Sequence, residues 1–228
     1  LKVSGAISKS IQGRNVVGIL EGSDPVLKRE YIAVTAHYDH VGVGEPNAAG
    51  DSIFNGARDN AIGTVGLLAT AMYLTKYRPK RSVLFVALTA EEKGLLGSAW
   101  YVRYPLVPLN QTVFNFNCDG AGYNDTTLVT VIGLERTSAA PTIEASCSVF
   151  GLQAKPDPAP EQNLYERSDN YNFAVKGVPA IDFAPGVRAF DAALFKYYHQ
   201  PADEAGSYAQ RLSQQRAQGV HRREWYLW

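Results

Sequence analysis

The sequence has no long hydrophobic run and no excess of charge of either sign. Its longest apolar stretches, such as SVLFVAL at residues 82–88, are far shorter than the roughly 20 residues that a membrane-spanning helix needs. The 22 basic and 22 acidic residues cancel, so charge gives no argument for binding nucleic acid or an anionic membrane. The first residues, LKVSGAISKSIQG, lack the basic and apolar segments of a signal peptide, although a mature secreted protein would look the same. Function must therefore be sought in local sites.

Cysteine is also scarce. The two cysteines, Cys118 and Cys147, are widely separated and do not have the spacing of a zinc finger. They can form one disulfide or remain as two thiols. Both stand in apolar contexts, where a free cysteine behaves as a small hydrophobic residue, and we therefore expect thiols.

The alternation of apolar runs with helical patterns predicts an α/β fold. At 228 residues the chain can bury a substantial core, and we expect one domain over residues 1–228. The expected strands are residues 15–20, 31–37, 82–90, 112–117, 127–133 and 178–185, and their continuous apolar character suits a sheet covered on both faces. Helices are expected at residues 59–77, 94–103, 138–150 and 168–176, and the Pro-rich stretch 154–162 is expected to be a loop.

Acidic and imidazole side chains follow three of the expected strands. One strand ends in His37 and Asp39, the next runs into Glu91 and Glu92, and the third runs into Asp119. Ligands of open α/β sheets bind outside the carboxyl ends of the strands, so we expect these groups to converge. Singly, each has an ordinary interpretation, because an exposed Glu-Glu pair is usually solvated and a lone histidine is usually structural.

Asp59 stands at the start of the longest expected helix, where an aspartate is most often an N-cap. Together with the other acidic side chains, Asp59 is instead a candidate metal ligand, because crowded carboxylates repel one another unless a positive charge lies among them. Only Arg58 is near in the sequence. Imidazole and carboxylate without thiolate favour zinc, or a related ion such as cobalt or manganese, and a hydrolytic centre. His199 provides a second imidazole far along the chain.

Six short motifs together resemble the M28 family of zinc aminopeptidases. They occur in the family's order and approximate spacing over residues 15–203, whereas any one of them alone would be a weak signal. This resemblance implies an M28-type peptidase domain with a mostly parallel, mixed β-sheet sandwiched between helices. The motifs are HYDH, NGARDNAIG, AEEKGLLGS, NCDG, RSDNYNFAVKGVPA and YHQPADE.

The resemblance also implies a co-catalytic pair of zinc ions. His37 and Asp119 would hold one ion, Glu92 and His199 would hold the other, and Asp59 would bridge both. Two metals about 3.5–4 Å apart can share the polarisation of a carbonyl and the activation of water.

Four further residues near the ligands receive roles by the same resemblance. Glu91 would be the general base, and Asp39 would orient the imidazole of His37 without being a ligand. Tyr198 matches a tyrosine that in some relatives hydrogen-bonds the oxyanion, although a packed tyrosine explains it equally well. His40 is not a ligand in the family pattern and is interpreted as structural.

The chain also departs from the family pattern. Asn170 stands where the family commonly has histidine, and Arg58 stands where an acid is frequent, so that this cation either alters substrate preference or points to solvent. The tail, residues 207–228, matches no family pattern. We expect it to form a terminal helix that packs Trp225, Tyr226 and Trp228 on the body.

The leading functional expectation is a metallo-aminopeptidase that acts on peptides with a free N-terminus, in a secreted or periplasmic location as is usual in the family. Alternatives are a glutaminyl cyclase-like acyl transferase with one zinc, a dipeptidase or carboxypeptidase of the same fold, and, least favoured, a non-catalytic binding domain. Aromatic side chains near His199 either line a substrate pocket or pack in the core. They are Phe183, Phe190, Phe195 and Tyr197.

Overall fold

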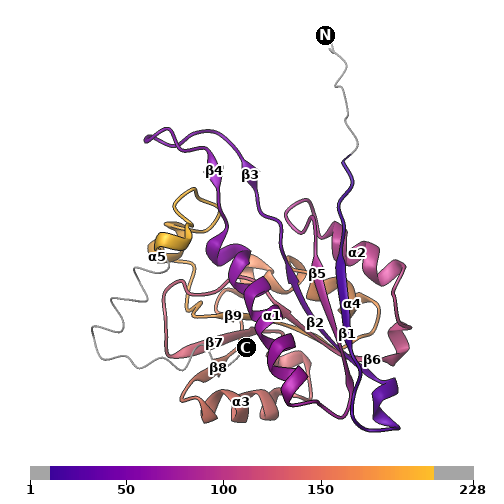
Figure 1. The fold of residues 1–228 in the computed structure, drawn as a ribbon. Coiled ribbons are helices and arrows are strands. Elements are labelled where there is room, and N and C mark those ends of the chain that lie inside the picture. Colours follow the sequence, from indigo (N-terminus) through magenta and orange to yellow (C-terminus); the bar gives the residue numbers. More distant parts are fainter. Residues whose placement is uncertain (1–10, 208–228) are drawn as a thin grey trace.

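A seven-stranded mixed sheet forms the centre of the molecule in the computed structural model, which describes residues 11–207 (Figure 1). The strand order is β1-β5-β2-β6-β9-β7-β8. Strands β5, β2, β6 and β9 run parallel, whereas β1 and β7 are antiparallel to their partners β5 and β9. The bounds are β1 Val16–Leu20, β2 Tyr31–His37, β5 Ser82–Leu88, β6 Thr112–Cys118, β7 Leu128–Ile132, β8 Gln153–Lys155 and β9 Ala180–Pro185.

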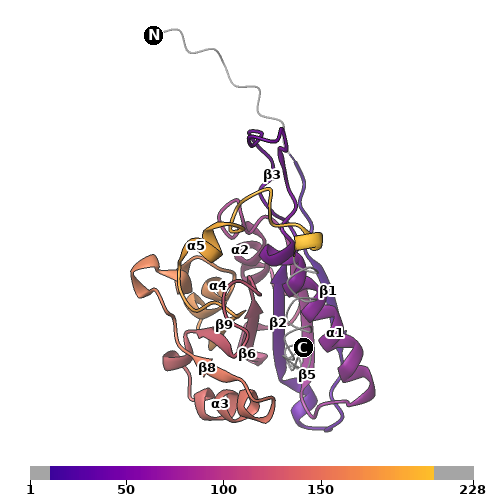
Figure 2. The same ribbon diagram turned by 90° about the vertical axis from the view of Figure 1, so that its left-hand side faces the viewer.

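Helices cover both faces of this sheet, with α1 on one side and α4 on the other (Figure 2). The side chains of β5 face the two sides of the sheet in turn, because successive side chains of a strand point to opposite faces. Leu84 packs with α2 and α4, whereas Val83 packs with α1. Helix α3 packs against β7 and β9. The helices are α1 Ile62–Lys76, α2 Leu96–Arg103, α3 Ala140–Val149, α4 Asn170–Val175 and α5 Ala192–Phe195.

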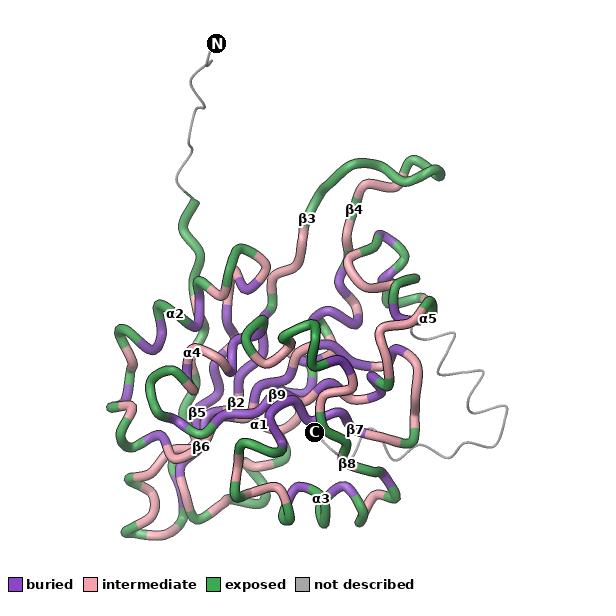
Figure 3. The backbone as a smooth tube through the Cα atoms, turned by 180° about the vertical axis from the view of Figure 1, so that it is seen from behind, coloured by how far each residue is buried: buried purple, intermediate pink, exposed green. Residues whose placement is uncertain are grey.

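The α/β fold and its mostly parallel mixed sheet are confirmed, and all six expected strands are present. Two features were not predicted from the sequence. Strand β8 overlaps the start of the expected loop, and a short hairpin of β3 (Gly42–Val43) and β4 (Ile53–Phe54) projects from the body. These strands have two or three residues each, which is too short for periodicity to reveal. Figure 3 shows that the hairpin is largely exposed and the central strands are buried.

Both cysteines are buried free thiols, as expected. The expected aromatic helix at the C-terminus lies outside the described residues. Among the residues that the structure describes, no helix has the length and apolarity to cross a membrane.

Asn60 joins the start of α1 to the end of β6. Its side-chain nitrogen donates to the backbone oxygen of Cys118 at 2.7 Å, and its Oδ1 accepts from the backbone N–H groups of Gly63 and Gly120. Helix α1 can approach β6 this closely because residue 63 is a glycine. The joint holds Asp59, which precedes Asn60, beside the residue that follows β6.

Gly63→Ala tests this joint. A Cβ atom at residue 63 would lie 2.6 Å from the backbone oxygen of Cys118, which the sheet holds in place. We expect the free energy of unfolding to fall by about 1–3 kcal/mol, the usual cost of adding a methyl group to a packed interior. Gly18→Ala is the matched control, because nothing lies within 4 Å of its Cβ position. Urea denaturation measures both variants, and equal stabilities would contradict the close contact.

Candidate metal centre

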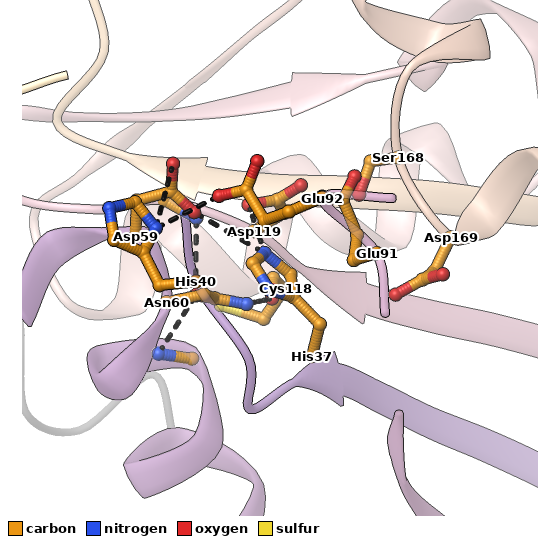
Figure 4. Close-up of polar contacts among 12 residues, drawn as sticks. His37, His40, Asp59, Asn60, Glu91, Glu92, Cys118, Asp119, Ser168 and Asp169 are labelled. Carbon is orange, nitrogen blue, oxygen red and sulfur yellow. Dashed lines mark hydrogen bonds and ion pairs between the residues drawn. The ribbon is translucent and has the colours of Figure 1, made fainter. Parts of the chain in front are cut away.

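The polar residues that follow three strands converge at one edge of the sheet (Figure 4). His37 is the last residue of β2, Asp119 directly follows β6, and Glu91 and Glu92 begin the turn that follows β5. Strands β5, β2 and β6 are neighbours and parallel, so their carboxyl ends meet at this edge. The expected convergence is therefore present.

Asp59 lies between two groups of potential ligands. The Nε2 atom of His37 lies 3.1 Å from Asp119 Oδ1 and 3.3 Å from Asp59 Oδ1. The Nε2 atom of His199 lies 3.1 Å from Asp59 Oδ2 and 3.3 Å from Glu92 Oε2. The two oxygens of one carboxylate thus face different groups, and all five residues expected as ligands are brought together.

The N-cap interpretation of Asp59 does not hold. Helix α1 begins at Ile62, its N-cap residue is Ala61, and no side chain accepts a hydrogen bond at that cap. Asp59 itself has non-helical backbone angles, φ −129° and ψ 86°. Its carboxylate is therefore available to the two histidines.

His40, interpreted from the sequence as structural, lies inside the same cluster. Its Nδ1 atom is 2.9 Å from Glu92 Oε1, and its side chain is only 8% exposed. The ring also meets the ring of His199 edge to face. Proximity alone does not make His40 a ligand, but it places a third imidazole beside the carboxylate of Glu92.

The donor set fits zinc. His37, Asp59 and Asp119 form one group of atoms within 4.8 Å of one another, and His40, Asp59 and Glu92 form another. Zinc bonds of 2.0–2.1 Å in a tetrahedron place neighbouring ligand atoms about 3.3 Å apart, which is close to the separations found here. Two divalent cations would also neutralise carboxylates that otherwise repel one another.

Asp39 contacts both His37 and the turn that carries the glutamates. Its backbone oxygen lies 3.1 Å from His37 Nδ1, whereas its carboxylate is 3.8 Å from that atom. The carboxylate instead accepts from the backbone N–H groups of Glu91, at 3.1 Å, and Glu92, at 3.4 Å. From the sequence, the expected partner of this carboxylate was the imidazole of His37 alone. Its hydrogen bonds to the turn were not predicted.

Asp203 was not singled out from the sequence, although it lies in the last motif. It is fully buried, and its carboxylate accepts from the backbone N–H groups of Arg58 and Asp59. It also pairs with the Arg58 guanidinium at 3.1 Å. Arg58 is completely buried over the ring of Tyr197, so the alternative in which it points to solvent is wrong. The pair anchors the segment that carries Asp59.

Glu91 lies beside the two groups of potential metal ligands without belonging to either of them. Burial raises the pKa of Glu91 to about 10, and the negative charge of Asp119 acts in the same direction. Hydrogen bonds to Asp59 and Glu92 raise the pKa of His199 to about 10. Cations bound in the cluster would oppose both shifts, because positive charge favours the carboxylate and the neutral imidazole.

A cavity of about 470 Å³ opens beside these residues. One end is lined by Asp59, Glu91, Glu92, Asp119 and His199, and the remainder is mostly apolar. Phe190 and Tyr198 line it, whereas the other aromatic candidates, Phe183, Phe195 and Tyr197, do not. Asn170 is buried away from the cavity.

Comparison with known proteins identifies relatives. The model of peptidase family M28 matches residues 15–222. The vacuolar membrane protease of Lachancea thermotolerans is 29% identical over 199 residues, which cover 85% of this chain and 18% of that protein. The vacuolar membrane protease of Saccharomyces cerevisiae is 34% identical over 111 residues, which cover 49% of this chain and 10% of that protein. The chain thus spans a small part of these relatives.

Solved structures are similar over most of the chain. BSAP, a zinc aminopeptidase from Bacillus subtilis, has a TM-score of 0.66 and 26% identity, covering 88% of this chain and 47% of that one. A Zn-dependent exopeptidase from Parabacteroides distasonis has a TM-score of 0.64, covering 88% of this chain and 76% of that one. At 17% identity the second likeness shows the fold alone.

The raised pKa values predict how stability depends on pH in chelator-treated protein. In the unfolded chain, Glu91 loses its proton near pH 4.5 and His199 near pH 6.5, whereas the folded state keeps both protons to about pH 10. Between pH 6.5 and 10 the folded state binds more protons, so stability must fall as pH rises.

Urea denaturation at pH 6.5 and pH 9.5 measures this fall. Glu91→Gln removes one of the two protons and should give a shallower dependence. Stability that stayed constant or rose over this range would contradict the assigned shifts. Added zinc should flatten the profile, because metal binding displaces protons from its ligands.

Proposed function

The chain belongs to peptidase family M28, and we propose that it is a two-zinc aminopeptidase that releases the N-terminal residue of a peptide. The observation that supports this most directly is the position of Asp59, whose two oxygens each face a separate pair of histidine and carboxylate ligands. His37 and Asp119 would hold one ion, Glu92 and His199 the other, and Asp59 would bridge them.

The chemistry that a zinc pair supplies when bound is polarisation of the scissile carbonyl and activation of a water molecule. Glu91 would take a proton from the attacking water and deliver it to the leaving amine nitrogen as the C–N bond breaks. Its position supports this role, because it lines the cavity beside the ligands and belongs to neither ligand group.

Tyr198 would hydrogen-bond the oxyanion that develops on the carbonyl oxygen. Its ring stacks on His199, and it lines the cavity. Its hydroxyl accepts a hydrogen bond from Arg167 Nη2 at 3.0 Å, which leaves the hydroxyl proton available for donation. Burial raises the pKa of Tyr198 to about 12, so the hydroxyl stays protonated at neutral pH.

Asp39 would act through its neighbours. By accepting from the backbone of Glu91 and Glu92, it fixes the turn that carries a proposed base and a proposed ligand. By its backbone oxygen it also fixes the ring of His37. Fixed orientation of ligands by such partners raises metal affinity.

Zinc-dependent hydrolysis of a free-amine substrate tests the proposal. Leucine p-nitroanilide and its N-acetylated form are compared in native protein, after chelation and after zinc is restored. We expect zinc-restored cleavage of the free-amine substrate alone, because an aminopeptidase requires the free α-amino group. Equal cleavage of both substrates would contradict it. Cleavage of neither, with zinc still bound, would favour the glutaminyl cyclase-like reaction or an exopeptidase with another free terminus.

Adjacent glutamates provide a matched pair of variants. Glu91→Gln should lower kcat by about 10²–10⁴-fold, the usual contribution of a general base, and should still bind two zinc ions. Glu92→Gln should lose zinc, measured by metal analysis after dialysis, because it removes a ligand. Full activity in Glu91→Gln would overturn its assignment as the base.

Tyr198→Phe separates oxyanion binding from packing in the same assay. Loss of one oxyanion donor typically costs about 10²–10³-fold in kcat, and KM should change little. A wild-type rate would assign Tyr198 to packing alone.

A further inference from the structure

A buried acid that has no part in the proposed zinc chemistry lines the same cavity. Asp182 of β9 is only 2% exposed and lines the cavity together with Ile132 and Ala184. Ile132 is its partner on β7, and Ala184 lies two residues further on the same face of β9. A carboxyl group in such apolar surroundings is costly unless it has a partner.

A ladder of hydrogen bonds across three strands holds this carboxyl group in place. Asn115 donates to Thr35 Oγ1 at 3.0 Å, and the Thr35 hydroxyl donates to Asn117 Oδ1 at 2.7 Å. Asn117 then uses its side-chain nitrogen twice, donating to Ser168 Oγ at 2.8 Å and to Asp182 Oδ1 at 2.9 Å. The ladder therefore ends on one oxygen of Asp182.

Among residues 11–207, the only hydrogen bond to the Asp182 carboxyl group is the one that Oδ1 accepts from Asn117, so Oδ2 has no donor there, and no ion pair within that range includes Asp182. Arg167 is the only lysine or arginine among the described residues that line the cavity. Its guanidinium donates to the Tyr198 hydroxyl and to the backbone oxygen of Gln162. The carboxyl group of Asp182 thus lacks a cationic partner from this part of the chain.

We propose that Asp182 is a specificity-determining residue that binds the cationic side chain of an N-terminal lysine or arginine. The inference rests on the proposed aminopeptidase function and names its substrate class. The methylene stem of such a side chain would pack on the apolar wall, and its charged end would pair with Oδ2 of Asp182. An uncharged side chain would instead leave this buried carboxyl without a partner.

The register of the strands places Asp182 at a suitable distance from the ligands. Asp182 pairs with Asn117 of β6, which lies two residues before Asp119. Two residues of a strand span roughly 7 Å, which is comparable to the reach of a lysine side chain. A substrate whose scissile carbonyl lies at the metal centre can therefore direct its first side chain toward Asp182.

Burial also bears on the charge of this group. It raises the pKa of Asp182 well above its usual value, and the negative charge of Asp119 adds to the effect. A cation beside the carboxylate acts in the opposite direction, so the substrate itself would favour the charged form.

The test compares lysine p-nitroanilide with norleucine p-nitroanilide, whose side chain has similar length and no charge. We expect kcat/KM of the wild-type enzyme to favour lysine by at least about tenfold. Asp182→Asn, which keeps the shape of the side chain, should bring the ratio close to one by lowering kcat/KM for lysine. Asp169→Asn is the matched control, because Asp169 is also buried but does not line the cavity, and its ratio should stay that of the wild type.

Other results would overturn the inference. Equal kcat/KM for the two substrates in the wild-type enzyme would do so without any variant. An equal loss for both substrates in Asp182→Asn would exclude recognition of the side chain. If no substrate were cleaved, the proposed function would fail, but the role of Asp182 would still be testable. Calorimetry would then compare the binding of lysine amide and of norleucine amide to zinc-loaded protein. Tighter binding of lysine amide supports the role of Asp182, and equal affinity contradicts it.

Discussion

Crowding of negative charge at one edge of the sheet is the constraint on which the site depends. Asp59, Glu92 and Asp119 approach the imidazoles of His37 and His199 to within 3.1–3.3 Å. Asp59 also has an oxygen within 4.8 Å of an oxygen of Asp119 and an oxygen within 4.8 Å of an oxygen of Glu92. Carboxylates this close repel one another, so the arrangement requires positive charge, supplied either by protons on the histidines or by metal ions. The choice between protons and cations links metal affinity to pH, because both compete for the same atoms.

The loops that carry these groups are held through their backbone. Asp203 accepts from the segment that includes Asp59, Asn60 ties that segment to the end of β6, and Asp39 accepts from the turn after β5. Because each contact fixes main-chain atoms, the side chains that project from them retain limited freedom. This is how a site composed of loop residues can keep the geometry that a metal pair requires.

The proposed recognition of the substrate's first side chain involves a second set of buried polar groups, on the sheet itself. Thr35, Asn117 and Asp182 form hydrogen bonds across β2, β6 and β9, and Asp182 lines the cavity together with the proposed ligands. These hydrogen bonds hold the proposed specificity residue near a proposed metal ligand, because β6 carries Asn117 two residues before Asp119.

Apolar periodicity predicted the α/β fold and the main strands, because it is a local property of the chain. The resemblance of six short motifs, in order and spacing, provided the five ligand candidates. The sequence could not reveal the roles of Asp182 and Asp203, since Asp182 lies outside the six motifs and the motif that contains Asp203 does not show which residues this carboxylate contacts. Their roles follow from contacts between residues far apart in the chain, such as Asp203 with Arg58 and Asp182 with Asn117. Such contacts form only when the chain folds, because burial and the pairing of strands bring those groups together.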